Sequence, residues 1–260
     1  MSGDGKNMFA EERRRRIVDM VHARSKIVIP ELCDHFGVSA STIRNDLRDL
    51  QEEGKITRTH GGAIINSKSG YEPLPLDKGT HHVERKRAIG RRAAELIENG
   101  DIIAIGTGTT TLEFVRCLDP SLELTVVVND IRIAAHLEQA AGYRVILLGG
   151  TLRNNFHYTQ MPPDNDYLAG MNIDKAFITC NGIDVRRGVT TPDPALAHDI
   201  RSVIAASSEL YVLCDSSKFG AVTFSRIAEL SAVTRVITDS GIAEDDMAAF
   251  REAGTEILIA

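Results

Sequence analysis

Polar and basic side chains gather between Ser39 and Arg48, in a stretch whose spacing predicts a helix. Ser39 is typical of a helix N-cap, and the apolar residues Ile43, Leu47 and Leu50 recur at i, i+4 and i+7, so they are expected to face a core. The remaining positions carry hydroxyl, amide and guanidinium groups, which bind base edges and phosphates in protein–DNA complexes. The candidate DNA-binding residues of this stretch are Ser39, Ser41, Thr42, Arg44, Asn45 and Arg48.

The residues before this helix predict the element that positions it. Residues 29–36 are expected to form a short helix with Pro30 in its first turn, and Gly37 allows the positive φ at which such a helix ends. A short helix, a glycine turn and a capped second helix form a helix-turn-helix. Taken alone, the stretch also fits an ordinary pair of packed helices.

A further helix and strand are expected upstream. The helix covers residues 9–24, with Phe9 and Ile17 among its inward-facing residues, and a short strand follows at residues 26–28. Four consecutive arginines, residues 13–16, wrap most of a turn of the helix. They are either a solvated face or contacts to DNA phosphates.

A β-hairpin is predicted after the helix-turn-helix. Residues 55–58 and 63–65 are short β-prone runs on either side of a glycine turn, which is the pattern of the wing in a winged helix. Arg58 and His60, at the tip, are placed to contact the DNA backbone or the minor groove. The sequence therefore predicts a winged helix-turn-helix DNA-binding domain over residues 9–65.

Composition and charge narrow the class of protein. Of the 260 residues 43% are hydrophobic, no apolar run is long enough to cross a membrane, and the polar N-terminus does not fit a secretory signal. Four widely spaced cysteines argue against a zinc site or a disulfide framework, so no metal or cofactor is expected. The same spacing is typical of a protein of the reducing cytoplasm, and a cytoplasmic location is expected. The net charge of −6 divides unevenly, because residues 1–65 carry +1 (11 Lys and Arg, 10 Asp and Glu) and the others carry −7. Clustering of basic groups on one face therefore matters more for DNA binding than the whole-chain charge.

The sequence pattern changes after residue 65. Residues 66–79 hold Ser, Gly, Lys and two prolines, which is typical of a linker. In residues 80–260 apolar strands alternate with helices, which predicts an α/β domain whose mostly parallel sheet is covered on both faces. Strands are expected at residues 102–105, 124–128, 143–148, 174–179, 209–214, 232–238 and 255–259, and helices at 81–97, 131–141, 194–207 and 244–253.

Ligands of such domains bind at the carboxyl ends of the strands. After the first strand come Gly106, Thr107, Gly108, Thr109 and Thr110, where glycines admit close backbone N–H groups, threonines add hydroxyls and a helix N-terminus favours an anion. The loop lacks the lysine of a nucleotide-binding P-loop and the glycine spacing of a dinucleotide site. These five residues are candidates for binding a phosphate, and a plain strand–helix turn is the alternative.

Three other loops at predicted strand ends carry polar groups. Asn129 follows one strand, and Asn181, Gly182 and Asp184 follow the next but one. Lys218 stands beside two serines after a further strand and is a natural partner for a phosphate. Any one loop also fits a solvated turn. Together they predict an effector pocket with anion donors on one side and acceptors for sugar hydroxyls on the other.

With these motifs assembled, the chain resembles the DeoR family of bacterial transcriptional repressors from residue 9 to residue 259. The resemblance is most specific at residues 38–39, 42–44, 46–47, 58–63, 108–110, 148–150 and 215–219. It implies that the second domain has the fold shared by ribose-5-phosphate isomerase and glucosamine-6-phosphate deaminase, reused as a sensor of a phosphorylated sugar or a related metabolite.

Departures from the family pattern bear on function. Asn45 stands where the family usually has a second arginine, and Gly106 where it commonly has an aspartate, so DNA contacts and the usual sugar-hydroxyl contact are expected to differ. The loop at residues 106–110 is closer to the phosphate loop of the isomerases, which makes a sugar-phosphate isomerase with an appended DNA-binding module the alternative function. Asp184 is the one isomerase carboxylate of three that is kept, so no enzyme activity and no catalytic residue are expected. Residues 156–166 are also unusual and are expected to shape the pocket.

The predicted function is that of a sequence-specific DNA-binding regulator, a repressor of a carbohydrate-utilisation operon. Its expected partners are a double-stranded DNA operator, a phosphorylated sugar effector and further copies of itself in a homo-oligomer, and no membrane. A small-molecule-binding protein whose helix-turn-helix contacts another protein is a further alternative, which the salt dependence of binding would separate.

Overall fold

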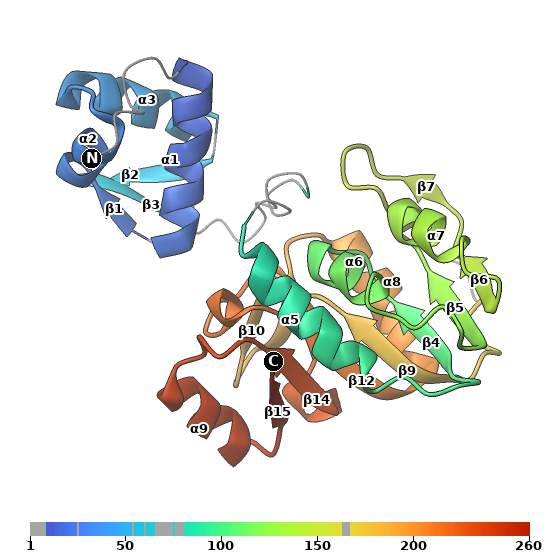
Figure 1. Ribbon diagram of the computed structural model, residues 1–260. Coiled ribbons are helices and arrows are strands. Elements are labelled where there is room, and N and C mark those ends of the chain that lie inside the picture. The colour runs from blue at the N-terminus through green and yellow to red at the C-terminus, as the bar shows by residue number, and fades with distance from the viewer. Residues whose placement is uncertain are drawn as a thin grey trace. The chain divides into compact units, whose positions relative to one another are not determined.

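The computed structural model describes residues 9–24, 26–53, 55–59, 61–65, 75, 81–162 and 167–260. The chain divides into two compact units, Met1–Tyr71 and Glu72–Ala260 (Figure 1). Of the predicted linker at residues 66–79, residue 75 alone is described. The predicted domain boundaries at residues 65 and 80 therefore stay predictions.

The N-terminal unit has three helices and a small antiparallel sheet. The helices are α1 (Ala10–Arg24), α2 (Ile29–Phe36) and α3 (Ala40–Glu52), and the strands are β1 (Lys26–Val28), β2 (Ile56–Thr59) and β3 (Gly62–Ile65), in the order β1-β3-β2. Their core includes Ile17, Leu32 and Leu47, all fully buried. The predicted winged helix-turn-helix is confirmed. The predicted inward position of Phe9 is wrong: this residue is 81% exposed, because it precedes α1, whose buried residues begin at Ile17.

A seven-stranded parallel sheet forms the centre of the C-terminal unit. Its order is β15-β14-β12-β9-β4-β5-β6, and every neighbouring pair is parallel. The strands are β4 (Ile102–Ile105), β5 (Leu124–Val128), β6 (Tyr143–Leu147), β9 (Ile173–Ile178), β12 (Ser207–Leu213), β14 (Arg235–Thr238) and β15 (Glu256–Ile259), which confirms the seven strands predicted from apolar runs. The chain runs outward from β4 to β6 and then outward from β9 to β15, so the strand order reverses between β4 and β9. In α/β sheets the crevice at such a reversal is where ligands bind.

Helices and a second sheet cover the two faces of the parallel sheet. On one face α5 (Val83–Ala94), α6 (Thr109–Val115) and α7 (Ile131–Leu137) bury Ile103 and Phe177. On the other face α8 (Pro194–Ala205), α9 (Glu244–Glu252) and a small antiparallel sheet bury Ala104 and Ile178, because successive residues of a strand point to opposite faces. Figure 1 shows α5 and α6 beside each other over the strands. The small sheet consists of β10 (Gly182–Asp184), β11 (Gly188–Thr191) and β13 (Ser225–Ala228), in that order.

Several short elements escaped sequence prediction. They are the small sheet, the antiparallel pair β7 (Thr151–Leu152) and β8 (Thr159–Gln160), and the 3₁₀ turns η1 (Ser216–Lys218) and η2 (Leu230–Ala232). Runs of two to four residues are too short for a hydrophobic period to show. For the predicted helices at residues 81–97 and 131–141, the observed α5 and α7 end earlier, at Ala94 and Leu137.

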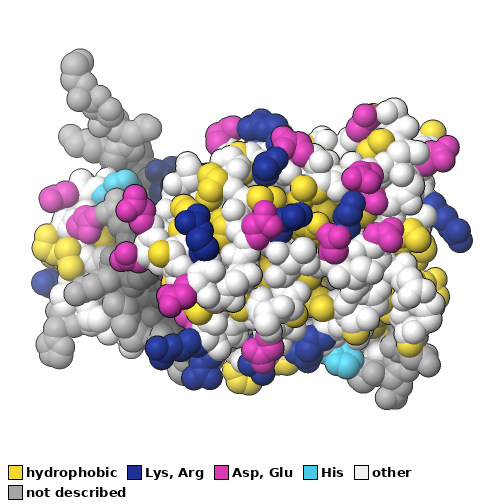
Figure 2. Space-filling view, turned by 90° about the horizontal axis from the view of Figure 1, so that it is seen from below, with side chains coloured by type: hydrophobic (Ala, Val, Ile, Leu, Met, Phe, Trp, Pro, Cys, Tyr) yellow, Lys and Arg dark blue, Asp and Glu magenta, His cyan; other side chains and the backbone are white. Residues whose placement is uncertain are grey.

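On the face of the molecule seen in Figure 2, acidic and basic side chains are interspersed. A net charge of −6 thus reflects a mixture and does not locate a binding surface. Among the described residues, no helix combines the length and the hydropathy needed to cross a membrane.

Candidate nucleic-acid interface and effector pocket

The helix α3 is fixed at its start and along its buried face. The Ser39 hydroxyl accepts the Thr42 N–H at 3.2 Å, as predicted for an N-cap, and lies 2.8 Å and 2.9 Å from the hydroxyls of Ser41 and Thr42. Ile43 and Leu47 are fully buried. Ser39 therefore has a structural role within the helix start, and its contact with DNA stays a prediction.

The opposite side of α3 faces solvent. Positions 41, 44, 45 and 48 are exposed or half-buried and are spaced so that they form one stripe, with position 42 half-buried beside them. Arg44 has no ion pair among the described residues, and Arg48 Nε lies 3.7 Å from Asp49 Oδ1. Exposed ion pairs of this kind contribute little to stability, so both guanidinium groups can bind a phosphate or a base. The stripe consists of Ser41, Thr42, Arg44, Asn45 and Arg48.

Two arginines of α1 bind α3. Arg13 donates to both carboxylate oxygens of Asp46, from Nε at 2.6 Å and from Nη2 at 3.1 Å, and Asp46 is 4% exposed. Arg14 Nη1 lies 3.1 Å from Asp49 Oδ2. A two-point guanidinium–carboxylate pair fixes geometry as well as charge. In the run at residues 13–16, the first two side chains therefore orient α3, a role that the sequence did not indicate.

The wing is tied to the end of α3. Arg58 is exposed, and its backbone N–H donates to Gln51 Oε1 at 3.0 Å. A Cβ atom on Gly62 would lie 1.9 Å from the carbonyl oxygen of Ile27, so β3 can approach β1 only with glycine at this position. His60, the other predicted wing contact, lies outside the described residues.

The loop at residues 106–110 crosses the end of β4, where the strand order reverses. The Gly106 N–H donates to Phe177 O of β9 at 2.9 Å, whereas the N–H groups of Thr107, Gly108, Thr109 and Thr110 have no acceptor in the part of the chain that the structure describes. Successive unpaired N–H groups make a concavity suited to an anion. Because α6 has only seven residues, the anion site is inferred from these N–H groups and not from the helix dipole.

Residues outside the predicted set hold this loop in place. The Thr107 hydroxyl donates to Asp130 Oδ2 at 2.7 Å, and the Thr179 hydroxyl donates to Thr107 O at 2.9 Å. Asp130 is fully buried, caps α7 and pairs with Arg132 at 3.2 Å. A Cβ on Gly108, whose φ is +155°, would lie 2.5 Å from the Thr179 hydroxyl. The loop is therefore preorganised, with the Thr107 hydroxyl used in its own structure.

The two predicted asparagines have partners within the fold. Asn129 Nδ2 donates to Thr159 O at 3.2 Å, and Asn181 Oδ1 accepts the Thr191 hydroxyl at 3.3 Å. Asn129 thereby holds the segment around β8 against the end of β5. The Asn181 Nδ2 group has no acceptor within the described ranges, so this side chain keeps donors for a ligand.

Gly182 and Asp184 belong to the small sheet. A Cβ on Gly182 would lie 2.2 Å from Ala221 O, which explains the glycine by packing alone. The Asp184 carboxylate accepts the N–H groups of Arg186 at 2.9 Å and Arg187 at 2.8 Å in the turn between β10 and β11. Both residues thus have structural roles, and their contact with an effector stays a prediction.

Lys218 ends the 3₁₀ turn at the end of β12. Burial acts to raise the pKa of the Asp215 carboxyl, but the Lys218 ammonium and hydrogen bonds from Ser217 outweigh burial and hold that pKa below its ordinary value. The Ser216 hydroxyl and N–H both bind Asp239, at 3.0 Å and 2.7 Å. The two serines beside Lys218 are therefore bound to carboxylates, and the lysine alone remains for a phosphate.

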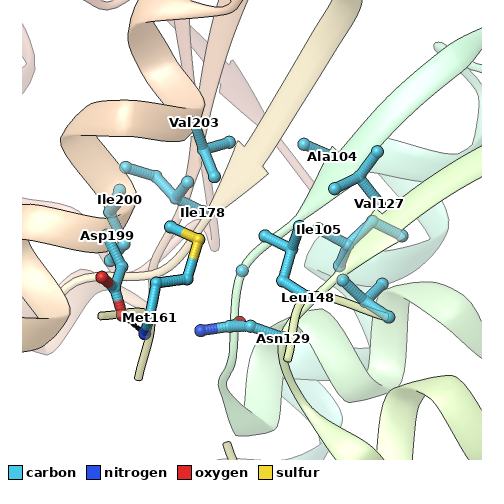
Figure 3. Close-up of a pocket in the computed structure, with 12 residues that line it drawn as sticks. Ala104, Ile105, Val127, Asn129, Leu148, Met161, Ile178, Asp199, Ile200 and Val203 are labelled. Atoms are coloured by element: carbon cyan, nitrogen blue, oxygen red, sulfur yellow. Dashed lines mark hydrogen bonds between the residues drawn. The ribbon is translucent and has the colours of Figure 1, made fainter. Parts of the chain in front are cut away.

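A cavity of about 20 Å³ lies beside the loop at residues 106–110 (Figure 3). The ends of β4 and β5 form one wall, including Gly106 and Asn129, and α8 forms the other. Asp199 of α8 lines it and is 3% exposed, and its Oδ2 accepts the Met161 N–H at 3.1 Å. Burial raises the pKa of the Asp199 carboxyl. Met161, from the segment at residues 156–166 that was expected to shape the effector pocket, lines this cavity, and Asp199 was not predicted.

Comparison with known proteins identifies the family. Residues 13–69 match the model of the DeoR-like helix-turn-helix domain, and residues 81–240 match that of the DeoR C terminal sensor domain. The chain belongs to the DeoR family of transcriptional regulators. The predicted resemblance is thus confirmed, and with it a DNA-binding regulator as the function of the chain.

Relatives along nearly the whole chain agree with the DeoR assignment. The chain is 33% identical to the HTH-type transcriptional regulator GlpR of Haloferax volcanii, over 96% of this chain and 98% of that protein. It is 29% identical to the putative aga operon transcriptional repressor of Escherichia coli O157:H7, over 99% and 97%. It is 32% identical to the lactose phosphotransferase system repressor of Staphylococcus epidermidis, over 88% and 92%. Among solved structures it is similar to ribose 5-phosphate isomerase A from Neisseria gonorrhoeae, with a TM-score of 0.39 and 16% identity over 52% of this chain and 53% of that chain.

The DeoR assignment does not favour the isomerase alternative, since the three relatives are named as regulators or repressors. Within the described ranges, no group of three or more His, Cys, Asp and Glu side chains is placed to hold a metal ion. Sequence reasoning placed Asp130 in a candidate loop without giving it a role, and it missed Thr179 and Asp199, which stand at a strand end and on a buried helix face and carry no motif. An acid on the buried side of α8 is the one signal that points to Asp199.

Proposed function

We propose that this DeoR-family regulator is a cytoplasmic repressor of a carbohydrate-utilisation operon and is controlled by a phosphorylated sugar. The observation that carries the effector assignment is the row of four backbone N–H groups, from Thr107 to Thr110, without acceptors among the described residues at the reversal of strand order. Such a row binds a phosphate through the backbone, and Lys218 adds the charge that a phosphate needs.

The DNA contact is assigned to the exposed stripe of α3. Arg44 and Arg48 supply bidentate donors for guanine or phosphate, Asn45 supplies an amide for adenine, and the wing supplies Arg58. A homo-oligomer places two such helices in successive major grooves, so the half-sites lie one helical turn, or a multiple of it, apart. The effector weakens DNA binding only as far as it binds the two subunit arrangements with different affinity.

A gel-shift assay tests the DNA assignment, with the duplex that the full chain selects from a random pool. Arg44→Ala is expected to weaken binding by about 1–3 kcal/mol and to relax the sequence preference at one position. Arg144→Ala, which removes an exposed arginine from β6, is the matched control and leaves binding unchanged. Equal affinity of the Arg44→Ala variant and the wild type contradicts the assignment of α3.

Thermal unfolding of the full chain with inorganic phosphate and with sugar phosphates tests the effector assignment. A ligand at a hundred times its Kd raises the unfolding free energy by about 2.7 kcal/mol. Gly108→Ala is expected to abolish this gain, because its Cβ would lie 2.5 Å from the Thr179 hydroxyl and displace the loop. Gly149→Ala, where a Cβ meets open space, is expected to keep it. An equal gain in both variants would remove the loop from the phosphate site.

A further inference from the structure

Among the described residues, one charged side chain lines the cavity beside the loop at residues 106–110. The described lining is apolar apart from Asn129 and Asp199, and Figure 3 shows Asp199 and Met161 joined on one side with Asn129 entering from the other. The apolar lining includes Ile178 of β9 and Ile200 and Val203 of α8. A space of about 20 Å³ holds about one water molecule or one small functional group.

The Asp199 carboxylate has acceptor capacity left to fill. The residue is 3% exposed, and the Met161 N–H at 3.1 Å is its one hydrogen-bond donor among the described residues. Asp199 also lines the cavity, where the neighbours Ile200 and Val203 offer no side-chain donor. A carboxylate accepts up to four hydrogen bonds, and leaving it buried with one is costly. A structural role alone does not explain an acid at position 199, because an apolar side chain of similar size would pack here without the cost of burying a carboxylate.

The position of this carboxylate gives a ligand in the pocket a direction. Gly106 lines the cavity, and the row of N–H groups without acceptors among the described residues begins at the next residue, Thr107. A Cβ at Gly106 would make an ordinary contact at 3.6 Å with Ile178, which lines the same cavity. An anion is attracted to the N–H row and repelled by Asp199. A ligand that fits both must carry its phosphate at one end and a neutral hydrogen-bond donor at the other.

We propose that Asp199 determines effector specificity by accepting a hydrogen bond from a terminal hydroxyl group of a phosphorylated sugar or polyol, and that it excludes sugar acids and bisphosphates. This inference rests on the proposed function, since it needs the phosphate at the loop. The cavity admits a hydroxyl or hydroxymethyl group and not an N-acetyl group. Met161, an unbranched side chain at the centre of the view in Figure 3, adapts to the sugar carbons.

Matched pairs of ligands test the inference on the full chain by isothermal titration calorimetry. The pairs are glycerol 3-phosphate and 3-phosphoglycerate, ribose 5-phosphate and 5-phosphoribonate, and glucose 6-phosphate and 6-phosphogluconate, with inorganic phosphate alongside. In the pair that binds, the wild type is expected to prefer the neutral member. Asp199→Asn is expected to lower the affinity for the neutral member about tenfold, because hydrogen bonds to charged groups are the strong ones. It is expected to raise the affinity for the acid by a similar factor.

Controls separate this role from a structural one. The side-chain amide oxygen of the Asp199→Asn variant would still accept the Met161 N–H, so this variant is expected to fold. Asp199→Val is expected to unfold at an equal or higher temperature than the wild type while losing the preference. Asp245→Asn removes one exposed acid from α9 and is expected to leave both members of each pair unchanged.

The outcomes distinguish the inference from the proposed function. A neutral-to-acid ratio that Asp199→Asn leaves unchanged, or a wild type that prefers the acid, overturns the role of Asp199 while phosphate binding at the loop stands. Binding of inorganic phosphate without any sugar overturns it as well. If neither phosphate nor any sugar phosphate binds the wild type, the effector site itself is wrong and the inference falls with it.

Discussion

Removing the buried carboxylate of α3 should strongly destabilise the DNA-binding unit. The Asp46 side chain is 6% exposed and the Arg13 side chain 11% exposed, and Nε lies 2.6 Å from Oδ2. Asp46→Ala leaves the Arg13 guanidinium buried beside α3 without its partner, which costs about 3–5 kcal/mol. A unit of about 60 residues has a total stability of roughly 3–9 kcal/mol. The loss is therefore a large part of what keeps α3 in place.

Asp49→Ala is the matched control on the same helix. Asp49 also pairs with an arginine of α1, at 3.1 Å, but its side chain is 37% exposed and that of Arg14 30% exposed. Water screens such a pair, and its removal costs at most about 1 kcal/mol. The two variants lose the same charge from the same element, so burial is the difference between them.

Hydrogen exchange read by mass spectrometry separates the two units of the full chain. Peptides from α1 and α3 are expected to exchange about a hundredfold faster or more in Asp46→Ala, and within a few-fold of the wild type in Asp49→Ala, while peptides from β4 and β5 stay unchanged in both. Equal exchange of α3 in the two variants would show that the buried pair does not hold the helix, and the reasoning from burial would be refuted.

Two further outcomes follow from the same kind of reasoning. Gly62→Ala is expected to destabilise the N-terminal unit by about 2 kcal/mol or more, since its Cβ would lie 1.9 Å from Ile27 O. A Cβ at Gly61 meets open space, so Gly61→Ala is the control and is expected to leave stability unchanged. Urea unfolding followed by circular dichroism compares the two variants, and equal midpoints would contradict the close approach of β3 to β1. Burial and a hydrogen bond to Glu209 raise the pKa of Tyr211 to about 12, so the folded state favours the neutral phenol, and its stabilising contribution is complete below about pH 10 and lost as the pH rises from there through about 12. Tyr211→Phe is expected to flatten the fall of the unfolding free energy over that range, and an unaltered slope would assign the fall to other groups.

The sequence predicted those features that local patterns determine. The cap at Ser39 and the spacing of Ile43 and Leu47 were enough for α3, because a helix face repeats every 3.6 residues. The loops at strand ends could be named as a set, because parallel strands bring their carboxyl ends to one edge. The family pattern also marked Gly106 as a departure, and the structure places Gly106 and Asp199 in the lining of the same cavity.

Features that depend on long-range packing escaped prediction. Arg13 reaches Asp46 across 33 residues, and nothing in a run of arginines tells which of them meets an acid on another helix. A short hairpin also escaped prediction: the Asp184 carboxylate accepts two N–H groups of its own turn, and its predicted contact with a sugar hydroxyl stays a prediction. Asp199 lies within α8, where a sequence shows an acid in a helix and not the cavity in front of it.

The packing of α5 shows how a ligand in the pocket would affect the rest of the chain. A Cβ on Gly90 of α5 would lie 2.8 Å from backbone atoms of Glu113, so α5 and α6 meet backbone to backbone, and α6 begins at Thr109 inside the loop at residues 106–110. At the start of α5, Arg85 Nη1 donates to the Ser216 hydroxyl at 3.0 Å, in the turn that carries Lys218.

The helix α5 therefore contacts both elements that are proposed to bind a phosphate, the helix α6 that begins in the loop at residues 106–110 and the turn with Lys218. Closely packed helices shift as bodies and do not deform continuously, so a phosphate that draws the loop and the turn together must move α5 or be opposed by it. Because α5 is the first helix described after residue 75, its start is where such a movement reaches the chain that leads to the DNA-binding unit. On the proposed function, an effector changes DNA binding only as far as it binds two arrangements of the chain with different affinity.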